Sequence, residues 1–136
     1  MRIVALDTNA YVAFKRSDER VLEVVRQAQT IAVSTVVLGE LLAGFLGGTR
    51  EASNRKELAQ FLGSPRVRTV AVTQATAEFY ARVFTDLRRK GRPIPSNDLW
   101  IAAGALELGA PLLTFDRHFS EIDGLRSGSE RSSLSD

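Results

Sequence analysis

Short apolar runs rich in β-branched residues alternate with longer segments of helical periodicity along the chain. The strand-like runs are residues 2–6, 30–34, 67–72 and 111–115. The helical segments are residues 18–29, 35–47, 54–62, 74–90 and 97–108. Strands that alternate with helices in one domain favour a parallel sheet covered on both faces. We therefore predict an α/β fold whose functional side chains gather beyond the carboxyl ends of the strands.

Composition excludes several other classes of protein. Hydrophobic residues make up 44% of the 136 residues and charged residues 25%, as in ordinary globular domains. There is no cysteine, which excludes disulfide scaffolds, thiolate zinc sites and cysteine nucleophiles. No charge-free run reaches the roughly 18 residues that span a bilayer, and the run before Asp7 is too short for a signal peptide. We expect a cytoplasmic protein with no membrane partner.

The same pattern predicts a domain boundary near the C-terminus. Residues 1–125 carry all the predicted strands and helices, so we expect one folded domain there. Residues 126–136 are rich in serine and have almost nothing to bury. Such a segment is expected to form a polar, flexible C-terminal tail.

Isolated acidic residues interrupt stretches that otherwise belong in the core. They are Asp7, Glu40, Asp98 and Asp116. Taken singly, Asp7 can cap a helix, Asp98 can favour the first turn of one, and Asp116 can begin a turn. Glu40 is harder to explain in this way, because its helix is otherwise mostly Val, Leu, Ala and Gly.

These carboxylates are predicted to converge. Asp7 and Asp116 each follow a predicted parallel strand, so they lie at one edge of the sheet, and Asp98 is joined to that edge by its helix. Close carboxylates repel by up to about 4 kcal/mol per pair at an effective dielectric of 20. A cation would relieve that repulsion, and oxygen ligands without cysteine select Mg²⁺ or Mn²⁺.

An ion of this kind supports the hydrolysis of phosphodiesters. It can lower the pKa of a coordinated water and stabilise charge on the leaving oxygen. The single histidine, His118, leaves no Ser-His-Asp set, and we place it outside the catalytic core. The residues therefore indicate metal-dependent nuclease chemistry.

Four segments carry a family resemblance. They are Leu6 to Asn9, Thr35 to Leu41 around Glu40, Asn97 to Ala103 around Asp98, and Leu113 to Phe119 around Asp116. In order and spacing they resemble the PIN-domain ribonucleases, and more narrowly the VapC toxins of type II toxin-antitoxin pairs. The resemblance extends from Met1 to about Leu125. It implies a PIN-like three-layer sandwich with a central parallel β-sheet, a Mg²⁺ or Mn²⁺ ion and endonucleolytic cleavage of RNA.

The resemblance also implies roles for single residues. Asp7, Glu40, Asp98 and Asp116 match the acidic quartet of the family. Asp7 and Asp98 would contact the metal most directly, Asp116 directly or through water, and Glu40 would hold a water or act as its base. Groups expected to orient these carboxylates are Thr8, Asn9, Ser34, Asn97 and Thr114. Asp123 stays open as a residue acting in place of Asp116 or beside it.

The expected partners come from the family as well. Similar toxins are neutralised by a small VapB-type antitoxin, whose C-terminal segment lies across the acidic pocket and whose N-terminal part binds operator DNA. DNA would then be bound only indirectly. Such toxins usually form homodimers, and their substrate is RNA.

A basic cluster at the end of the segment 74–90 has two interpretations. Its residues include Arg88, Arg89, Lys90 and Arg92. It is either a solvated helix end or a surface that binds the RNA backbone. For Trp100 and Tyr11 we favour core packing or a dimer contact over stacking on bases.

Three other functions remain as hypotheses. The chain could be a PIN-fold RNA-processing nuclease without an antitoxin, or a non-catalytic module that binds RNA or a protein partner. The presence of all four acids argues against the second of these. An aspartyl-phosphate enzyme is least favoured, because residue 9 is Asn where such a phosphatase has a second Asp.

Overall fold

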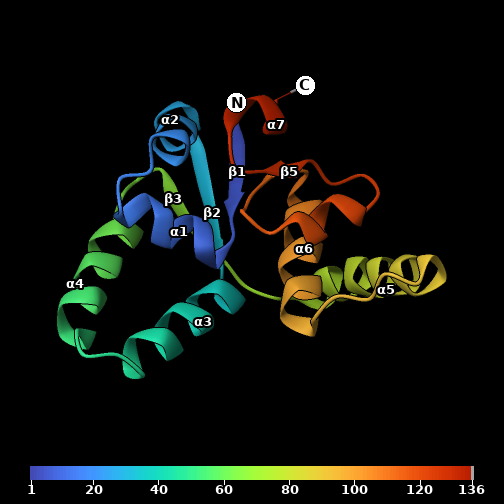
Figure 1. The fold of residues 1–136 in the computed structure, drawn as a ribbon, viewed down its shortest axis with the longest axis horizontal. Coiled ribbons are helices and arrows are strands. Elements are labelled where there is room, and N and C mark those ends of the chain that lie inside the picture. Colours follow the sequence, from blue (N-terminus) through green and yellow to red (C-terminus); the bar gives the residue numbers. More distant parts are fainter. Residues whose placement is uncertain (136) are drawn as a thin grey trace.

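Parallel strands form one central sheet in the computed structural model, which describes residues 1–135 (Figure 1). The strands are β1 (Ile3–Leu6), β2 (Thr30–Ser34), β3 (Val67–Val70), β4 (Leu112–Leu113) and β5 (Ser127–Gly128). Their order across the sheet is β3-β2-β1-β4-β5, and every neighbouring pair is parallel. The predicted α/β class with a central parallel sheet is confirmed.

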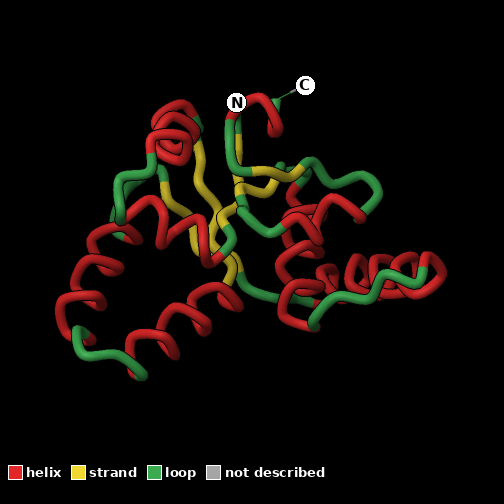
Figure 2. The backbone as a smooth tube through the Cα atoms, in the orientation of Figure 1, coloured by secondary structure: helices red, strands yellow, loops and turns green. Residues whose placement is uncertain are grey.

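Helices cover the sheet on both sides. The α-helices are α1 (Thr8–Lys15), α2 (Glu19–Gln27), α3 (Thr35–Leu46), α4 (Glu51–Leu62), α5 (Gln74–Lys90), α6 (Ser96–Leu108) and α7 (Arg131–Leu134), with a 3-10 helix at Arg117–Glu121. Helices α1, α2 and α4 lie on one side of the strands and α5 and α6 on the other (Figures 1 and 2). No helix in this described part of the chain has the length and apolar character needed to cross a membrane.

The centre of the sheet positions the site. Strand β1 is apolar throughout and packed on both faces, since Val4 and Leu6 on one face are at most 1% exposed and Ala5 on the other is 8% exposed, as expected for a central parallel strand. It pairs with β4 in a register that places Leu6 beside Leu113. The Asp7 amide then donates to the Leu113 carbonyl at 3.0 Å. The residues that follow β1 and β4 are therefore held side by side.

Two local predictions need correction near this edge. No helix was predicted between the first strand and residue 18, but Thr8–Lys15 forms helix α1, because Asp7 adopts an extended conformation and caps it. The predicted strand 111–115 pairs only over Leu112–Leu113. The chain leaves the sheet at Thr114, whose side chain is used within the site.

The C-terminal segment also differs from expectation. Instead of a loose tail, Ser127–Gly128 pairs with β4, and Leu134 is 1% exposed. Backbone hydrogen bonds need no apolar side chain, so a serine-rich segment can complete a sheet edge. The Leu112 and Thr114 amides donate to the carbonyls of Arg126 and Gly128, both at 2.9 Å. Asp136, the last residue of the predicted tail, lies outside the described residues.

Candidate active site

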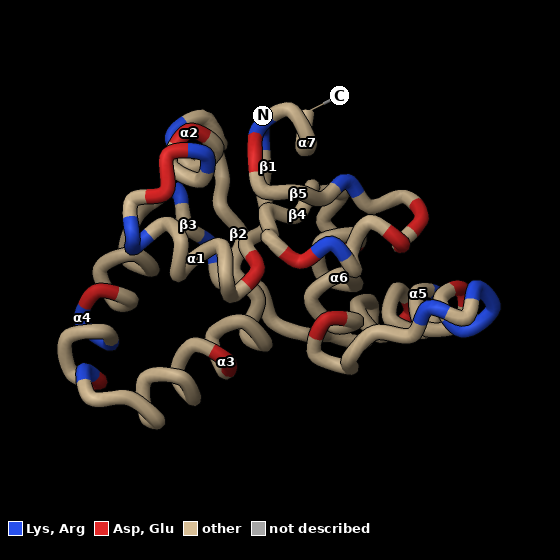
Figure 3. The backbone as a smooth tube through the Cα atoms, in the orientation of Figure 1, with Lys and Arg blue, Asp and Glu red and all other residues tan. Residues whose placement is uncertain are grey.

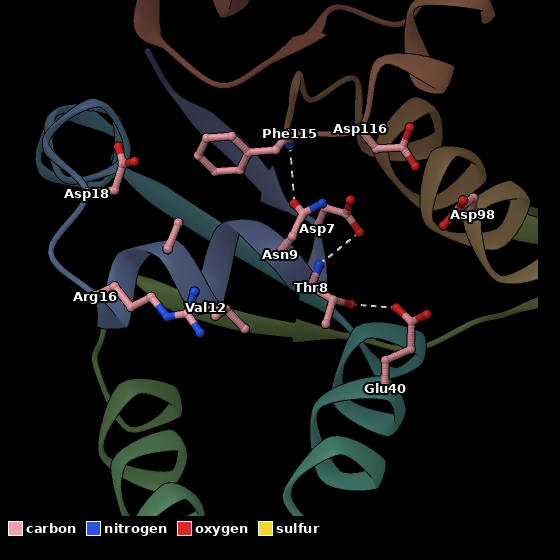
Figure 4. Close-up of a pocket in the computed structure, with 11 residues that line it drawn as sticks. Asp7, Thr8, Asn9, Val12, Arg16, Asp18, Glu40, Asp98, Phe115 and Asp116 are labelled. Carbon is pink, nitrogen blue, oxygen red and sulfur yellow. Dashed lines mark hydrogen bonds between the residues drawn. The ribbon is translucent and has the colours of Figure 1, made fainter.

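A pocket of about 690 Å³ opens beyond the carboxyl ends of β1 and β4 (Figure 4). It is lined by Asp7, Thr8, Asn9, Val12, Ala13, Arg16, Asp18, Glu40, Asp98, Phe115 and Asp116. The four predicted acids thus reach one pocket from four different elements. This is the edge of the sheet at which the sequence pattern predicted a site.

Asp7 is the most tightly held of these acids. Its side chain is buried, with the residue 5% exposed, and caps helix α1. The Thr8 amide donates to Oδ1 at 2.8 Å, and the Thr114 hydroxyl donates to Oδ2 at 2.6 Å. Burial raises the pKa of Asp7, while these two hydrogen bonds act in the opposite direction. Both oxygens therefore have a fixed orientation.

Glu40 projects from α3 and is positioned by two other elements. The Thr8 hydroxyl at the start of α1 donates to Oε1 at 2.5 Å. The Asn97 amide nitrogen on α6 donates to Oε2 at 3.3 Å. Thr8 and Asn97 are thus brought into contact with a predicted catalytic carboxylate, and they tie α1, α3 and α6 together at the pocket.

Asp98 lies in the first turn of α6 and is only partly buried. Among residues 1–135 its carboxylate accepts no hydrogen bond that would offset this burial. Burial, together with the negative charges of Asp7, Asp116 and Glu40 in that order of effect, raises the pKa of Asp98 to about 6. The acids are therefore close enough to repel one another, as predicted.

Asp116 caps the 3-10 helix and is linked to Asp7 through Thr114. Its amide donates to the Thr114 hydroxyl oxygen at 3.0 Å, and Oδ1 accepts from the His118 amide at 2.9 Å. The same Oδ1 lies 3.1 Å from Nδ1 of His118. His118 does not line the pocket, but the structure places it in direct contact with one of the four acids.

Two further predicted residues act on the backbone. Asn9 accepts a hydrogen bond from the Phe115 amide at 3.2 Å, which fixes the chain between Thr114 and Asp116. Ser34 differs from its predicted role. Its hydroxyl accepts from the Val36 amide at 2.9 Å, so it caps α3 and does not line the pocket. Its effect on Glu40 is confined to starting that helix.

Asp123 and the basic cluster lie elsewhere. Asp123 is exposed, pairs with Lys90 at 2.7 Å and does not line the acidic pocket, so the alternative to Asp116 is not supported. Figure 3 shows the basic residues of Arg88 to Arg92 at the tip of α5, away from the end of β1. None of them lines the pocket.

The oxygen donors of the pocket fit a hard divalent cation. Neither histidine nor cysteine lines it. No group of three or more Asp, Glu or His side chains in the described part of the chain is arranged so that it could hold a metal ion. Mg²⁺ is usually held by one or two carboxylates and keeps several waters. An open pocket with several acids suits such a partly hydrated ion.

The sequence analysis missed one side of the pocket. Val12, Ala13, Arg16 and Asp18 line it, although only the acids and their immediate neighbours were predicted. A helix predicted directly after Asp7 would have indicated Val12 and Arg16, because residues spaced four apart lie on the same helix face as Thr8. Phe115 lies within a predicted motif, but no role was assigned to it.

The fold and the pocket define a class of protein, the α/β domains with a cluster of acids at the carboxyl edge of a parallel sheet. The sequence profile described as PIN domain matches residues 4–125. This chain belongs to the PIN-domain family and, within it, to the VapC group.

Individual relatives support that assignment. Ribonuclease VapC5 of Mycobacterium tuberculosis is 31% identical over 122 residues, which cover 90% of this chain and 89% of that protein. Ribonuclease VapC2 of Rickettsia felis is 33% identical over 128 residues, covering 90% and 94%. The structure of VapBC2 from Rickettsia felis bound to a promoter DNA fragment matches with a TM-score of 0.81 at 29% identity, covering 92% of this chain and 96% of that one.

Proposed function

We infer that this protein is a ribonuclease and the toxin of a toxin-antitoxin pair. The observation that carries this inference is the convergence of Asp7, Glu40, Asp98 and Asp116 on one open pocket in a PIN-domain chain. The relatives of 31% and 33% identity are both named ribonucleases. The reaction is hydrolysis of an RNA phosphodiester bond.

We further propose that activity depends on Mg²⁺ or Mn²⁺. When bound, such an ion lowers the pKa of water and stabilises the negative charge that develops on the phosphodiester. Asp7 and Asp98 would hold it, with Asp116 contributing directly or through water. The raised pKa of Asp98, caused by burial and by its acidic neighbours, supports this assignment, because a cation would remove the repulsion.

Glu40 is the proposed base. Its two carboxylate oxygens are oriented by Thr8 and Asn97, so the side chain cannot swing freely. It would accept a proton from the attacking water as the new oxygen–phosphorus bond forms and the bond to the leaving oxygen breaks. Thr114 keeps Asp7 aimed into the pocket, and Asn9 keeps the Phe115 backbone in place.

The proposed protein partner is a small VapB-type antitoxin. Several similar structures are VapBC complexes, among them VapBC-1 of nontypeable Haemophilus influenzae, with a TM-score of 0.78 at 27% identity. DNA would be contacted only through that antitoxin.

We also propose a homodimer. Phe84, 44% exposed and stacked on Tyr80, belongs to an aromatic surface on α5 that a second copy would cover.

Cleavage of a structured RNA by the purified chain tests the function. The reaction is run with Mg²⁺ or Mn²⁺, with EDTA, and with an Asp98→Asn variant prepared in the same way. We expect specific cuts that disappear with EDTA and in the variant. Asp123→Asn removes an acid outside the pocket and is the matched control, which should cut normally. Equal cutting by Asp98→Asn and the unmodified protein would mean a contaminating nuclease and would overturn the assignment of Asp98.

A further inference from the structure

The acidic pocket has a second side that the proposed chemistry does not use. Opposite Asp98 and Asp116, the pocket is bounded by the last turns of α1 and by the chain after β4 (Figure 4). That side contributes Val12, Ala13, Arg16, Asp18 and Phe115. It combines apolar surface, a cation and an aromatic ring with one carboxylate, Asp18, which is paired with Arg20.

Arg16 is the only Lys or Arg that lines the pocket in the part of the chain the structure describes. The neighbouring cations already have partners. Lys15 pairs with Glu57 at 3.2 Å, and Arg20 pairs with Asp18 at 3.2 Å. Asp18 also caps α2 by accepting from the Arg20 and Val21 amides. Arg16 itself is exposed and has no side-chain hydrogen bond or ion pair within residues 1–135, so its guanidinium can bind a ligand.

A tight turn brings Arg16 to the pocket. Helix α1 ends at Lys15, and Ser17 adopts a left-handed conformation with a φ of 61°. The Asp18 amide donates back to the Ala13 carbonyl at 3.0 Å, which closes the turn. Left-handed φ is uncommon for residues other than glycine. The turn is held by backbone bonds, and the position of Arg16 at the rim therefore follows from the fold.

Phe115 is fixed just as firmly. It lies between Thr114, which bonds Asp7, and Asp116, and its amide donates to Asn9 at 3.2 Å. The Arg20 guanidinium lies 5.1 Å from the centre of the ring. Arg20 does not line the pocket, so it supports the ring from outside. A half-buried, oriented aromatic ring is the kind of surface on which proteins stack unpaired bases.

We propose that Arg16 and Phe115 form a nucleotide subsite for single-stranded RNA beside the catalytic acids, with a backbone phosphate on Arg16 and a base on Phe115. The inference rests on the proposed ribonuclease function and extends it to how the substrate is held. The acids repel phosphates, so a substrate needs a compensating charge within the same pocket. The predicted basic cluster on α5 does not line the pocket, whereas Arg16 does.

The test measures binding and catalysis separately. Binding of a short fluorescein-labelled single-stranded RNA of mixed sequence is followed by anisotropy over a series of salt concentrations, in the Asp98→Asn background, which keeps the RNA intact. We expect Arg16→Gln to raise Kd about tenfold and to reduce the salt slope by about 0.7, the value for one phosphate contact on a single strand. Arg26→Gln removes an exposed charge on α2 outside the pocket and should leave the slope unchanged.

Phe115 is tested in the same assay. Phe115→Leu should raise Kd about tenfold with no change in the salt slope, because stacking is not ionic. Phe115→Tyr should keep the affinity. Phe79→Leu is the control, because it removes a partly buried ring that also contacts an arginine but lies outside the pocket. Thermal unfolding of each variant shows whether the fold is intact, and Phe115→Tyr keeps the test informative if Phe115→Leu is unstable.

Failure of this inference can be told from failure of the proposed function. If the unmodified chain cleaves RNA but Arg16→Gln changes neither Kd nor the salt slope, the subsite is wrong and the ribonuclease stands. If the unmodified chain neither cleaves nor binds RNA, both are overturned. A parallel rise in KM with kcat kept in Arg16→Gln supports a substrate-binding role.

Discussion

The β1 side and the α6 side of the acidic pocket hold their carboxylates in different ways. On the β1 side, Asp7 is buried, caps a helix and accepts hydrogen bonds from Thr8 and Thr114. On the α6 side, Asp98 has no hydrogen-bond donor among the described residues, and burial together with the neighbouring acids raises its pKa to about 6. Burial and neighbouring acids raise the pKa of both carboxylates, but only Asp7 has hydrogen bonds that act against the rise, so a bound cation would relieve more unfavourable charge at Asp98.

The largest expected effect is a loss of catalytic rate, and we expect it for the acid on either side of the pocket. Asp7→Asn and Asp98→Asn should each lower kcat for RNA cleavage on the order of a thousandfold, because each removes a charge that holds the cation. Asp123→Asn is the control and should stay within about twofold. Single-turnover cleavage with Mn²⁺ measures all three. A nearly active Asp7→Asn protein would show that only the α6 side serves the reaction.

The next largest effect concerns a residue that positions an acid of the site and does not itself bind the cation. Thr114→Val removes the buried hydroxyl that donates to Asp7 at 2.6 Å and accepts from the Asp116 amide. Metal affinity should fall by about tenfold to a hundredfold, and unfolding free energy by about 1 to 2 kcal/mol. Mn²⁺ titration and urea unfolding give the two values. Thr69→Val on the exposed face of β3 is the control, and equal behaviour of the two variants would contradict the role of Thr114.

Substitution of Asp98 and substitution of Asp7 should change the free energy of unfolding in opposite directions. The pKa of Asp98 is raised from 3.8 to about 6 by folding, so stability falls as pH rises between those values. Without metal at pH 7, Asp98→Asn should therefore be more stable by about 1 kcal/mol, after allowing for solvent screening in the open pocket. Below pH 4 this gain should vanish.

Asp7→Ala should instead lose about 2 kcal/mol, because the α1 cap is lost and the Thr114 hydroxyl is left without its acceptor. Urea unfolding in EDTA at both pH values measures these differences. Destabilisation by Asp98→Asn at pH 7 would show that the Asp98 carboxylate makes a stabilising contact. The proposed difference between Asp7 and Asp98 would then be wrong.

The smallest expected effect concerns the two donors to Glu40. Thr8→Val removes a short hydrogen bond of 2.5 Å and should lower cleavage about tenfold. Asn97→Ala removes a longer bond of 3.3 Å at an exposed position and should cost only about threefold, with stability changed by less than about 0.5 kcal/mol. Cleavage rates at saturating Mn²⁺ give the ratio of the losses in the two variants. A larger loss for Asn97→Ala would place the main support of Glu40 on α6.

Much of the site could be predicted because its chemistry conflicts with its surroundings. An isolated carboxylate is rarely buried without a partner, so Asp7 and Glu40 stand out against apolar neighbours. Residues such as Arg16 do not stand out, since a cation near the end of a helix is ordinary. The expected role of Ser34 was wrong and Asp123 was left open for a related reason, because spacing along the chain does not say which hydroxyl or acid faces the pocket.

The sequence by itself determined the alternating α/β architecture and the acids at the carboxyl edge of the sheet, because strand and helix periodicity and the cost of burying charge are local properties. Only the tertiary structure decided that Thr114 holds Asp7, that Arg16 and Phe115 complete the pocket, and that Ser127–Gly128 closes the sheet. These features depend on the register between distant strands and on the turn after α1. Such contacts join residues up to 107 positions apart, and no local pattern specifies them.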